Sequence, residues 1–431
     1  MGSWSLVGGW LLWTVTGFGV LSLAVLLAVR RPRFWTRTAP IAVASVTVVV
    51  VAVAVLVDVV WQPFPDRIPL SNLVWGGVAL LGIALAGVRL HRLRWRWRFG
   101  VVVAAGAVLV MSVAQINAFW GVFPTVHSVH DALRAPRQGI PPGAGPGGPV
   151  ATARPGGTLL ETWQPPAGMP ASGAISQVQI PATVSRFRAR PGYVYLPPAY
   201  SVSPRPLLPV LVLLAGQPGS PGDWFSFLRL TEAADAYAHT HKGLGPVIVV
   251  ADDLGSTWAN PLCVDSPLGN AETYLATDVP TWIRANLQVA THRVAWFVGG
   301  YSHGGTCALQ MAVRASQTYG GFIDISGQRE PTLGSRSRTL QRAFGGSAAA
   351  FARVNPLDIL KRNRYAQTAG FLTVGTADQT YLPQQREVRR ACVAAGMDIT
   401  WLELPGGHNA TVWRDSLVGA LPWLGTHARL A

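Results

Sequence analysis

The sequence has little cysteine and almost no lysine. Three cysteines occur in 431 residues, which is too few for a disulfide scaffold or for a structural zinc site. Only two of the 35 basic residues are lysine, Lys242 and Lys361, and we attribute this bias to genome composition. Acidic residues number only 20, so the formal net charge is +15.

This excess of positive charge is concentrated near the N-terminus. The first 120 residues contain ten arginines against Asp58 and Asp66, a net charge of +8. Most of these arginines flank long apolar runs, where basic residues set the orientation of membrane helices. The charge therefore does not require a nucleic-acid partner, and we expect none.

Four apolar runs cover residues 7–29, 40–61, 71–90 and 101–120. Each is close to the roughly 20 residues that cross a bilayer as a helix, so we expect a four-helix transmembrane region over residues 1–121. The first run lacks the preceding positive charge of a cleaved signal peptide. Arginines follow the first and third runs, so the positive-inside rule predicts a multi-pass protein of the cell membrane with both ends of this region outside.

The segment 92–98 alternates arginine with Trp95 and Trp97. It could bind lipid headgroups, but a basic collar with interfacial tryptophans that fixes topology is the simpler interpretation. After it and the last apolar run, residues 136–157 are dense in proline and glycine. Such a composition is typical of a spacer, so we expect a linker over residues 122–173 and a globular domain over residues 174–431.

The globular part alternates short β-branched or apolar runs with helical patterns. The runs that predict strands are 174–180, 192–196, 207–214, 246–250, 293–298, 321–325, 371–374 and 399–404. The helical patterns are 224–240, 271–290, 305–318, 384–395 and 411–424. This alternation predicts an α/β domain with a mostly parallel sheet and helices on both faces.

The segment 292–312 is the most informative stretch of the chain. It reads as a buried strand, a sharp turn Gly-Tyr-Ser-His-Gly-Gly from Gly300 to Gly305, and a helix. A G-x-S-x-G turn between strand and helix is typical of a nucleophile elbow, which makes Ser302 the candidate nucleophile. The alternative is a glycine-rich turn with an idle serine.

Partners for Ser302 are expected at the carboxyl ends of other strands, where α/β proteins place their chemistry. Asp378 follows the strand that ends near 374, and His408 follows the strand that ends at 404. The order serine, aspartate, histidine is that of α/β hydrolases. In the loop after residue 214, the main-chain N–H of Gln217 is a candidate oxyanion donor, with that of His303 as the second. The alternatives are a helix-capping His408 and an exposed Asp378.

Three further acids, Asp252, Asp253 and Asp265, lie in the loop after residue 250. They could bind a cationic substrate group, although hydrogen bonds within the loop are the favoured interpretation. Cys263 in this loop and Cys307 after the elbow could meet at the carboxyl edge of the sheet. In an oxidising compartment they would pair, but sequence alone leaves the pairing open.

Residues 181–408 resemble the putative-esterase family of α/β hydrolases, which includes esterase D and the antigen mycolyltransferases. The resemblance rests on the stretches YVYLPPAY, LPVLVLLAGQPGSPGDW, GYSHGGTCALQMA, GTADQTY and PGGHNATVW. It implies that Ser302 is the nucleophile, Asp378 the acid, His408 the base and Gln217 an oxyanion donor. The chain departs from the family where Ala215-Gly216 stands in place of the His-Gly of many relatives, and in its four-helix region.

These features predict a membrane-anchored serine esterase that needs no metal or organic cofactor. The expected substrate is an acyl or aminoacyl ester of a membrane lipid or an envelope glycolipid, and the expected partners are that ester and membrane lipids. The connection 327–368 is rich in Arg, Ser and Gly, unlike an apolar lipase lid. An acyltransferase that uses a hydroxyl acceptor, as mycolyltransferases do, is one alternative, and a non-catalytic docking module is another.

Overall fold

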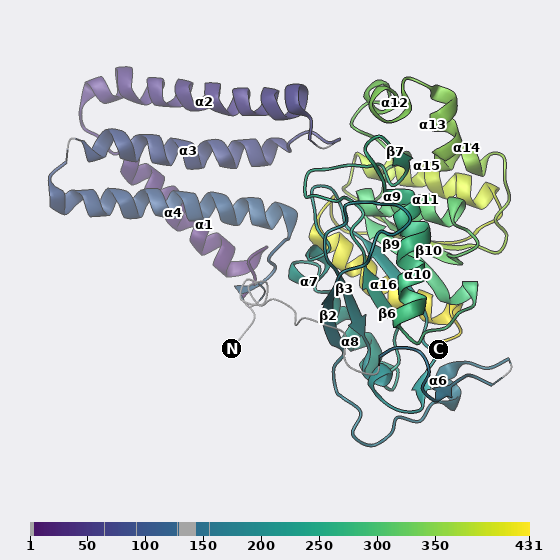
Figure 1. Cartoon of the computed structure of the whole chain (residues 1–431). Coiled ribbons are helices and arrows are strands. Elements are labelled where there is room, and N and C mark those ends of the chain that lie inside the picture. Colours follow the sequence, from purple (N-terminus) through teal and green to yellow (C-terminus); the bar gives the residue numbers. More distant parts are fainter. Residues whose placement is uncertain (1–3, 64, 92, 127, 129–143, 155) are drawn as a thin grey trace. The chain divides into compact units, whose positions relative to one another are not determined.

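The structure is a computed structural model of the whole chain, and it describes residues 4–63, 65–91, 93–126, 128, 144–154 and 156–431. The chain divides into two compact units, Met1–Leu133 and Arg134–Ala431. The first unit consists of long apolar helices, and the second has a central sheet (Figure 1).

Four long helical segments form the first unit. They are α1 (Gly9–Leu27), a segment in which the π-helical turns η1 (Phe34–Thr38) and η2 (Leu56–Trp61) flank α2 (Ala39–Val55), then α3 (Leu70–Leu90) and α4 (Trp95–Trp120). Each is long and apolar enough to cross a membrane. All four coincide with the apolar runs expected from sequence.

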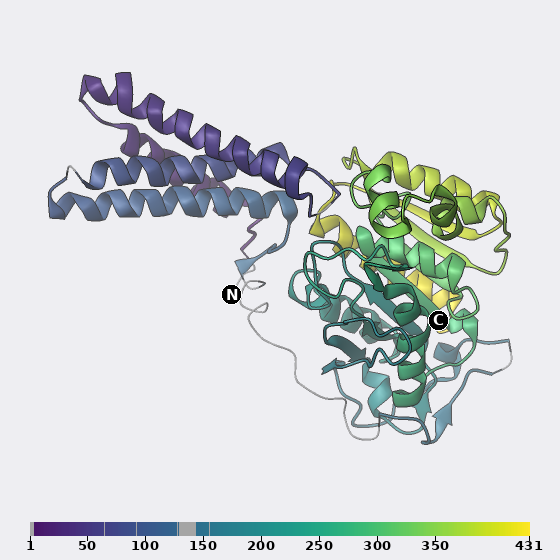
Figure 2. The same ribbon diagram turned by 45° about the horizontal axis from the view of Figure 1, so that its top comes forward.

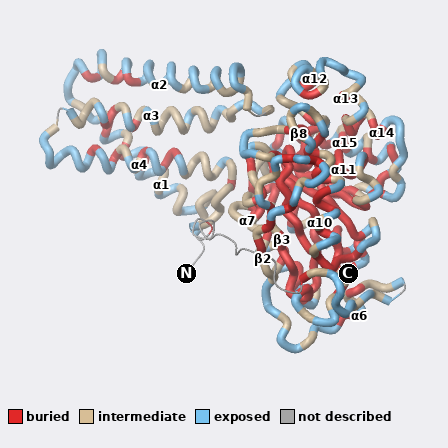
Figure 3. Tube along the Cα trace, in the orientation of Figure 1, coloured by how far each residue is buried: buried red, intermediate tan, exposed pale blue. Residues whose placement is uncertain are grey.

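Helix α4 lies between α1 and α3 and contacts both, while α2 packs along α3. The small core of this unit includes Leu26, Leu85, Val108 and Met111. Most other apolar side chains on these helices are exposed or half-buried, in contrast to the buried strands of the second unit (Figure 3). Outward-facing apolar side chains are what helices surrounded by lipid present.

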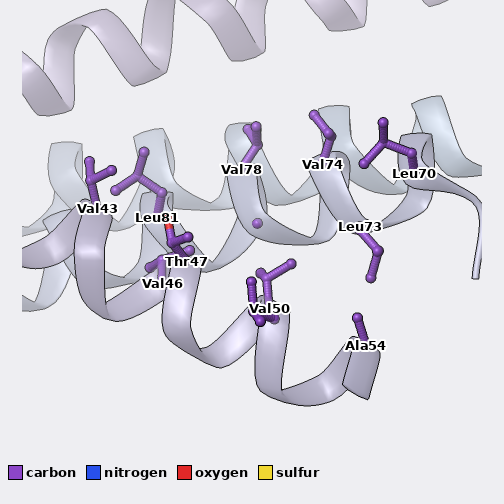
Figure 4. A pocket seen from close by; sticks show the side chains of 12 residues that line it. Val43, Val46, Thr47, Val50, Ala54, Leu70, Leu73, Val74, Val78 and Leu81 are labelled. Atoms are coloured by element: carbon purple, nitrogen blue, oxygen red, sulfur yellow. The ribbon is translucent and has the colours of Figure 1, made fainter. Parts of the chain in front are cut away.

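A groove of about 360 Å³ runs between α2 and α3. Figure 4 shows its lining, which comes mainly from valine and leucine side chains of these two helices, among them Val50, Val74 and Leu81. The lining is apolar apart from the hydroxyl of Thr47, so it offers little that could select a ligand by hydrogen bonding.

The second unit is built on an eight-stranded sheet with the order β12-β11-β10-β9-β5-β6-β3-β2. The strands are β2 (Ala174–Val178), β3 (Gly192–Leu196), β5 (Val210–Leu214), β6 (Val247–Val250), β9 (Trp296–Tyr301), β10 (Gly321–Ile325), β11 (Ala369–Gly375) and β12 (Asp398–Leu404). The six neighbouring strands β12, β11, β10, β9, β5 and β6 run parallel to one another, and β3 pairs antiparallel with both β6 and β2. The expected mostly parallel sheet is confirmed.

Helices cover both faces of this sheet (Figures 1 and 2). The main ones are α8 (Leu230–Thr240), α10 (Val279–Asn286), α11 (His303–Arg314), α14 (Pro356–Leu360), α15 (Tyr381–Ala394) and α16 (Ala410–His427). Thr373 of β11 hydrogen-bonds Ser416 of α16, whereas Asp324, in register with Leu372, hydrogen-bonds Gln385 of α15. Leu372 and Thr373 are neighbours on β11 and point to opposite faces of the sheet, and Asp324 points to the same face as Leu372. Helices α15 and α16 therefore lie on opposite faces of the sheet.

Shorter elements complete the unit. They are the 3-10 turns η3 (Pro198–Ser201) and η5 (Arg293–Ala295), the hairpin β7 (Asp265–Ser266) and β8 (Gly269–Asn270), and the helical segments α7 (Asp223–Ser226), α9 (Ala271–Thr273), η4 (Tyr274–Asp278), α12 (Arg336–Phe344) and α13 (Ala348–Val354).

Part of the expected linker packs onto the second unit. Residues 129–143 lie outside the described residues, but β1 (Val150–Ala151) pairs with β4 (Arg205–Pro206), and α6 (Leu159–Thr162) follows. Leu159 and Trp163 are buried in the core of the unit. The packed unit thus begins before residue 174, because a few apolar residues after the Pro/Gly stretch are enough to dock this segment.

Candidate active site

Ser302 stands at the turn between β9 and α11, with φ 54° and ψ −119°. This conformation is strained for a residue with a side chain, and it is typical of a nucleophile elbow. The turn is so tight that a Cβ on Gly300 would lie 2.4 Å from the main chain of Gly304, and a Cβ on Gly304 would lie 2.4 Å from the carbonyl oxygen of Leu214. The glycines of the motif are therefore required by the backbone.

Ser302, His408 and Asp378 lie in hydrogen-bonding contact. Nε2 of His408 is 3.0 Å from Oγ of Ser302, and Nδ1 of His408 is 2.9 Å from Oδ2 of Asp378. The three residues follow the carboxyl ends of β9, β12 and β11. Two loops meet there, because the main-chain N–H of Thr376 donates to the carbonyl of Leu404. The arrangement can pass a proton from the serine hydroxyl to the imidazole.

Aromatic side chains surround the imidazole of His408. Tyr381 stacks on it with ring centroids 4.2 Å apart, and Trp413 meets it edge-on at 5.1 Å. Trp413 also stacks on Tyr301, the residue before Ser302. Sequence reasoning did not single out Tyr381 or Trp413, although both stand within the GTADQTY and PGGHNATVW stretches.

Buried side chains form hydrogen bonds to the loop after β5. Oδ1 of Asp253 accepts a hydrogen bond from the main-chain N–H of Ala215, and the hydroxyl of Tyr301 accepts one from Gly216. The side chain of Gln217 donates to the carbonyl of Trp258, at 3.1 Å. This bond joins the side chain of Gln217 to the loop after β6. The oxyanion donor proposed from the sequence is the main-chain N–H of this residue.

His303 contributes differently through its main chain and its side chain. It is the first residue of α11, and the first N–H groups of a helix have no acceptor within the helix. Its imidazole is buried, and burial lowers its pKa to about 4. Its Nε2 lies near Cys307 and Asp253, whereas the imidazole that contacts Ser302 is that of His408.

Cys263 and Cys307 are joined in a disulfide, and Cys392 is a buried free thiol. Nε2 of His303 lies 3.3 Å from the sulfur of Cys307. Ligand atoms of Asp253, Cys263, His303 and Cys307 all lie within 4.8 Å of one another. A cluster of this kind binds zinc only when its sulfurs are thiolates, whereas here the two sulfurs bond each other.

The acids of the loop after β6 are engaged with the protein. The buried Asp252 forms an ion pair with the half-buried Arg190, at 2.7 Å. Asp265 accepts hydrogen bonds from the main chain and the side chain of Thr273. Together with the bond from Asp253 to the loop after β5, these contacts favour the interpretation that the three acids stabilise loops.

Seven arginines lie in the connection 327–368 between β10 and β11, which the sequence predicts to be polar. Two of them face acids: Arg329 lies 3.5 Å from Glu387, and Arg336 lies 2.8 Å from Glu330. On α12, Arg342 is exposed and Arg338 is half-buried. Part of this positive charge is thus balanced by the protein itself.

Comparisons with known proteins agree on the C-terminal unit. Residues 187–424 match the model of the family described as putative esterase. Over 97% of its length the chain is 33% identical to an uncharacterised protein of Corynebacterium glutamicum, of which it covers 96%. The similarity to this protein therefore includes the apolar helices.

Among solved structures, the chain is similar to a ferulic acid esterase, with a TM-score of 0.52 and 18% identity over 61% of this chain and all of that one. It is also similar to an S-formylglutathione hydrolase from Agrobacterium tumefaciens, with a TM-score of 0.49 and 16% identity over 61% of this chain and 97% of that one. At such low identity the first likeness establishes the fold, an α/β-hydrolase domain, and nothing about substrate.

Proposed function

Because the chain belongs to the putative esterase family, we propose that it is a membrane-anchored serine esterase that uses Ser302, His408 and Asp378 as a catalytic triad. Esterase-type hydrolysis follows from the family. The triad is supported by one observation above all: the imidazole of His408 lies between the hydroxyl of Ser302 and the carboxylate of Asp378, at 3.0 and 2.9 Å.

In this proposal Nε2 of His408 takes the proton of Ser302 as its Oγ attacks the ester carbonyl carbon. The C–O bond to the alcohol breaks, and the alcohol leaves with the proton that His408 returns. Water, deprotonated by His408, then attacks the acyl carbon. The bond between this carbon and Oγ of Ser302 breaks, and His408 returns the proton to Oγ as the acid leaves. Asp378 keeps Nδ1 protonated and stabilises the imidazolium that forms in both steps.

The negative oxygen of each tetrahedral intermediate needs hydrogen-bond donors at a fixed place. The main-chain N–H groups of Gln217 and His303 fill this role in the proposal. The first is supported by the hydrogen bonds that Asp253 and Tyr301 make to the preceding loop residues. The second is supported by its position at the start of α11.

Intact triad geometry favours catalysis over a docking module, which has no need for a serine in a strained conformation.

We propose a lipid-linked substrate, an acyl or aminoacyl ester of a membrane lipid or envelope glycolipid, because four helices long and apolar enough to cross a membrane belong to the same chain. Such an anchor keeps an active site near lipid substrates.

The proposed topology has the catalytic unit outside the cell membrane, and it rests on the arginine distribution. Reporter fusions after Arg37 and Arg98 should give a cytoplasmic signal, and a fusion after Pro136 an external one. The opposite pattern would contradict both the topology and an envelope substrate.

A fluorophosphonate probe tests the function directly. Such probes label activated serines, so the full-length protein should be labelled at Ser302, and Ser302→Ala should remain unlabelled. Lipid extracts incubated with the two proteins should then differ by one or more esters that only the active protein consumes. Consumption without release of free acid would instead indicate transfer of the acyl group to a hydroxyl acceptor.

A further inference from the structure

The two hydrogen bonds of His408 leave one motion of its ring unrestrained. They act at Nδ1 and Nε2, on opposite sides of the imidazole. Rotation about the line through these atoms tilts the ring while it keeps both contacts nearly intact. Proton transfer depends on the direction of the Nε2 lone pair, so a catalytic imidazole needs a contact on its face as well.

Tyr381 supplies this contact. Its ring lies nearly parallel to the imidazole, with an interplanar angle of 20° and centroids 4.2 Å apart. Trp413 approaches at 81°, so it limits sideways movement. A stacked ring excludes the tilt because rotation of the imidazole would drive its edge into the aromatic face.

Tyr381 is itself fixed at both ends. Its main-chain N–H donates to Oδ1 of Asp378, at 2.9 Å, so the carboxylate that orients His408 through Oδ2 also holds the first residue of α15. At the other end, Nε2 of Gln328 donates to the Tyr381 hydroxyl, at 3.2 Å. Tyr381 is 2% exposed and Gln328 is 6% exposed, so water competes little for either bond.

Gln328 is in turn tied to the helix that begins at the nucleophile. Its main-chain N–H donates to Oγ1 of Thr306, at 2.8 Å, and its side-chain oxygen accepts a hydrogen bond from the same hydroxyl. Thr306 lies one turn after Ser302 on α11, and its main-chain N–H donates to the carbonyl of Ser302. Contacts therefore form a closed path from Ser302 through Thr306, Gln328 and Tyr381 to His408, and back to Ser302.

We propose that Tyr381 is a positioning residue that fixes the plane of His408, and that Gln328 fixes Tyr381 relative to the nucleophile helix. The inference rests on the proposed function, because it assigns these residues a role in the triad's reaction. It adds a second connection between nucleophile and base that does not pass through Asp378. Loss of the ring should lower the chemical rate and leave substrate binding largely unchanged.

The test uses full-length protein in detergent and a soluble p-nitrophenyl ester. Tyr381→Leu removes the stacked ring, and kcat should fall by about 10- to 100-fold, the range expected when a catalytic group is misplaced by about 1 Å, with KM within about twofold. Tyr381→Phe restores the ring, and kcat should return to within about threefold of the original protein. A general loss of stability would not follow the ring in this way.

Two further variants make the test independent of whether Tyr381→Leu folds. If the hydroxyl of Tyr381 acts through Gln328, then Tyr381→Phe combined with Gln328→Met should lower kcat no further than Gln328→Met alone, because Gln328→Met has already removed the bond between the two side chains. Tyr319→Leu is the matched control. Tyr319 is also fully buried, but its hydroxyl donates to the carbonyl of Leu275, so its loss should leave kcat per labelled serine within about twofold.

The possible outcomes separate the inference from the proposed function. If the unaltered protein is not labelled by fluorophosphonate, the proposed function fails. If it is labelled, the positioning role is overturned by a Tyr381→Leu protein with unchanged kcat, by equal losses in Tyr381→Leu and Tyr319→Leu, or by multiplicative effects of Tyr381→Phe and Gln328→Met.

Discussion

Oδ2 of Asp253 lies 3.6 Å from Nε2 of His303, the residue that follows Ser302 in the elbow, and both side chains are buried. Burial raises the pKa of Asp253 well above its usual value, and the neighbouring charge of Asp252 raises it further. Burial also lowers the pKa of His303 to about 4. Near neutral pH both pKa shifts favour the uncharged forms of the two side chains, which reduces the free-energy cost of burying this pair beside a disulfide.

The pKa of His303 predicts a pH dependence of stability. The folded pKa of about 4 lies below the model value of 6.5, so the unfolded chain binds the proton more readily. The stabilising contribution of neutral His303 is complete above about pH 6.5 and is lost as the pH falls toward 4. The shift corresponds to about 3 kcal/mol.

His303→Gln should therefore flatten the decline in the unfolding temperature of the catalytic unit between pH 6.5 and 4. The raised pKa of Asp253 acts in the opposite sense, which is why the variant must be compared with the unaltered protein at each pH. The measurement is thermal unfolding of the detergent-solubilised protein, followed by near-ultraviolet circular dichroism. Equal slopes in both proteins would contradict the buried neutral imidazole.

The triad predicts a common loss of activity from three different changes. Ser302→Ala, His408→Ala and Asp378→Asn should each lower turnover of a short-chain ester by at least about a thousandfold, because members of a triad act as a unit. Initial rates with a p-nitrophenyl ester measure this. Asp265→Asn serves as the control, since the side chain of Asp265 hydrogen-bonds Thr273, which is not part of the triad. Full activity of Ser302→Ala would end the esterase interpretation.

Local sequence signals were sufficient for the α/β fold, the apolar helices and the loops that carry Ser302, Asp378 and His408. The limits appear where structure depends on distant contacts. Residues 224–240 were expected to form one helix, but α7 and α8 are separated by Arg229, which adopts a positive φ of 56°. No glycine marks that break.

The environment of His408 illustrates the same limit. Tyr381 and Trp413 each stand within a few residues of a triad member, so their proximity to the site could have been anticipated. The stacking of Tyr381 could not, because it depends on the orientation of α15. Gln328 is 50 residues from Asp378 in sequence and carries no motif, and only the adjacency of β10 and β11 brings it to the Tyr381 hydroxyl.

The disulfide predicts which cysteines are bonded and which is free. Mass spectrometry of alkylated, unreduced protein should find Cys263 and Cys307 in one cross-linked peptide and Cys392 as the only alkylated cysteine, provided that unfolding precedes alkylation because Cys392 is buried. Pairing is favoured in an oxidising compartment, so the protein should be taken from its native membrane. Three free thiols in that sample would contradict the bond.

The apolar helices predict a difference between soluble and membrane-embedded substrates. Deletion of residues 1–120 should leave hydrolysis of a p-nitrophenyl ester within about twofold, because the catalytic unit is compact by itself and the triad residues all belong to it. Hydrolysis of an ester embedded in vesicles should fall strongly, because the anchor raises the local concentration of lipid substrate at the active site. Fusion of the catalytic unit to an unrelated apolar helix should restore that loss if tethering is what the native helices provide. Equal effects of the deletion on both substrates would show that the helices serve something other than access to lipid.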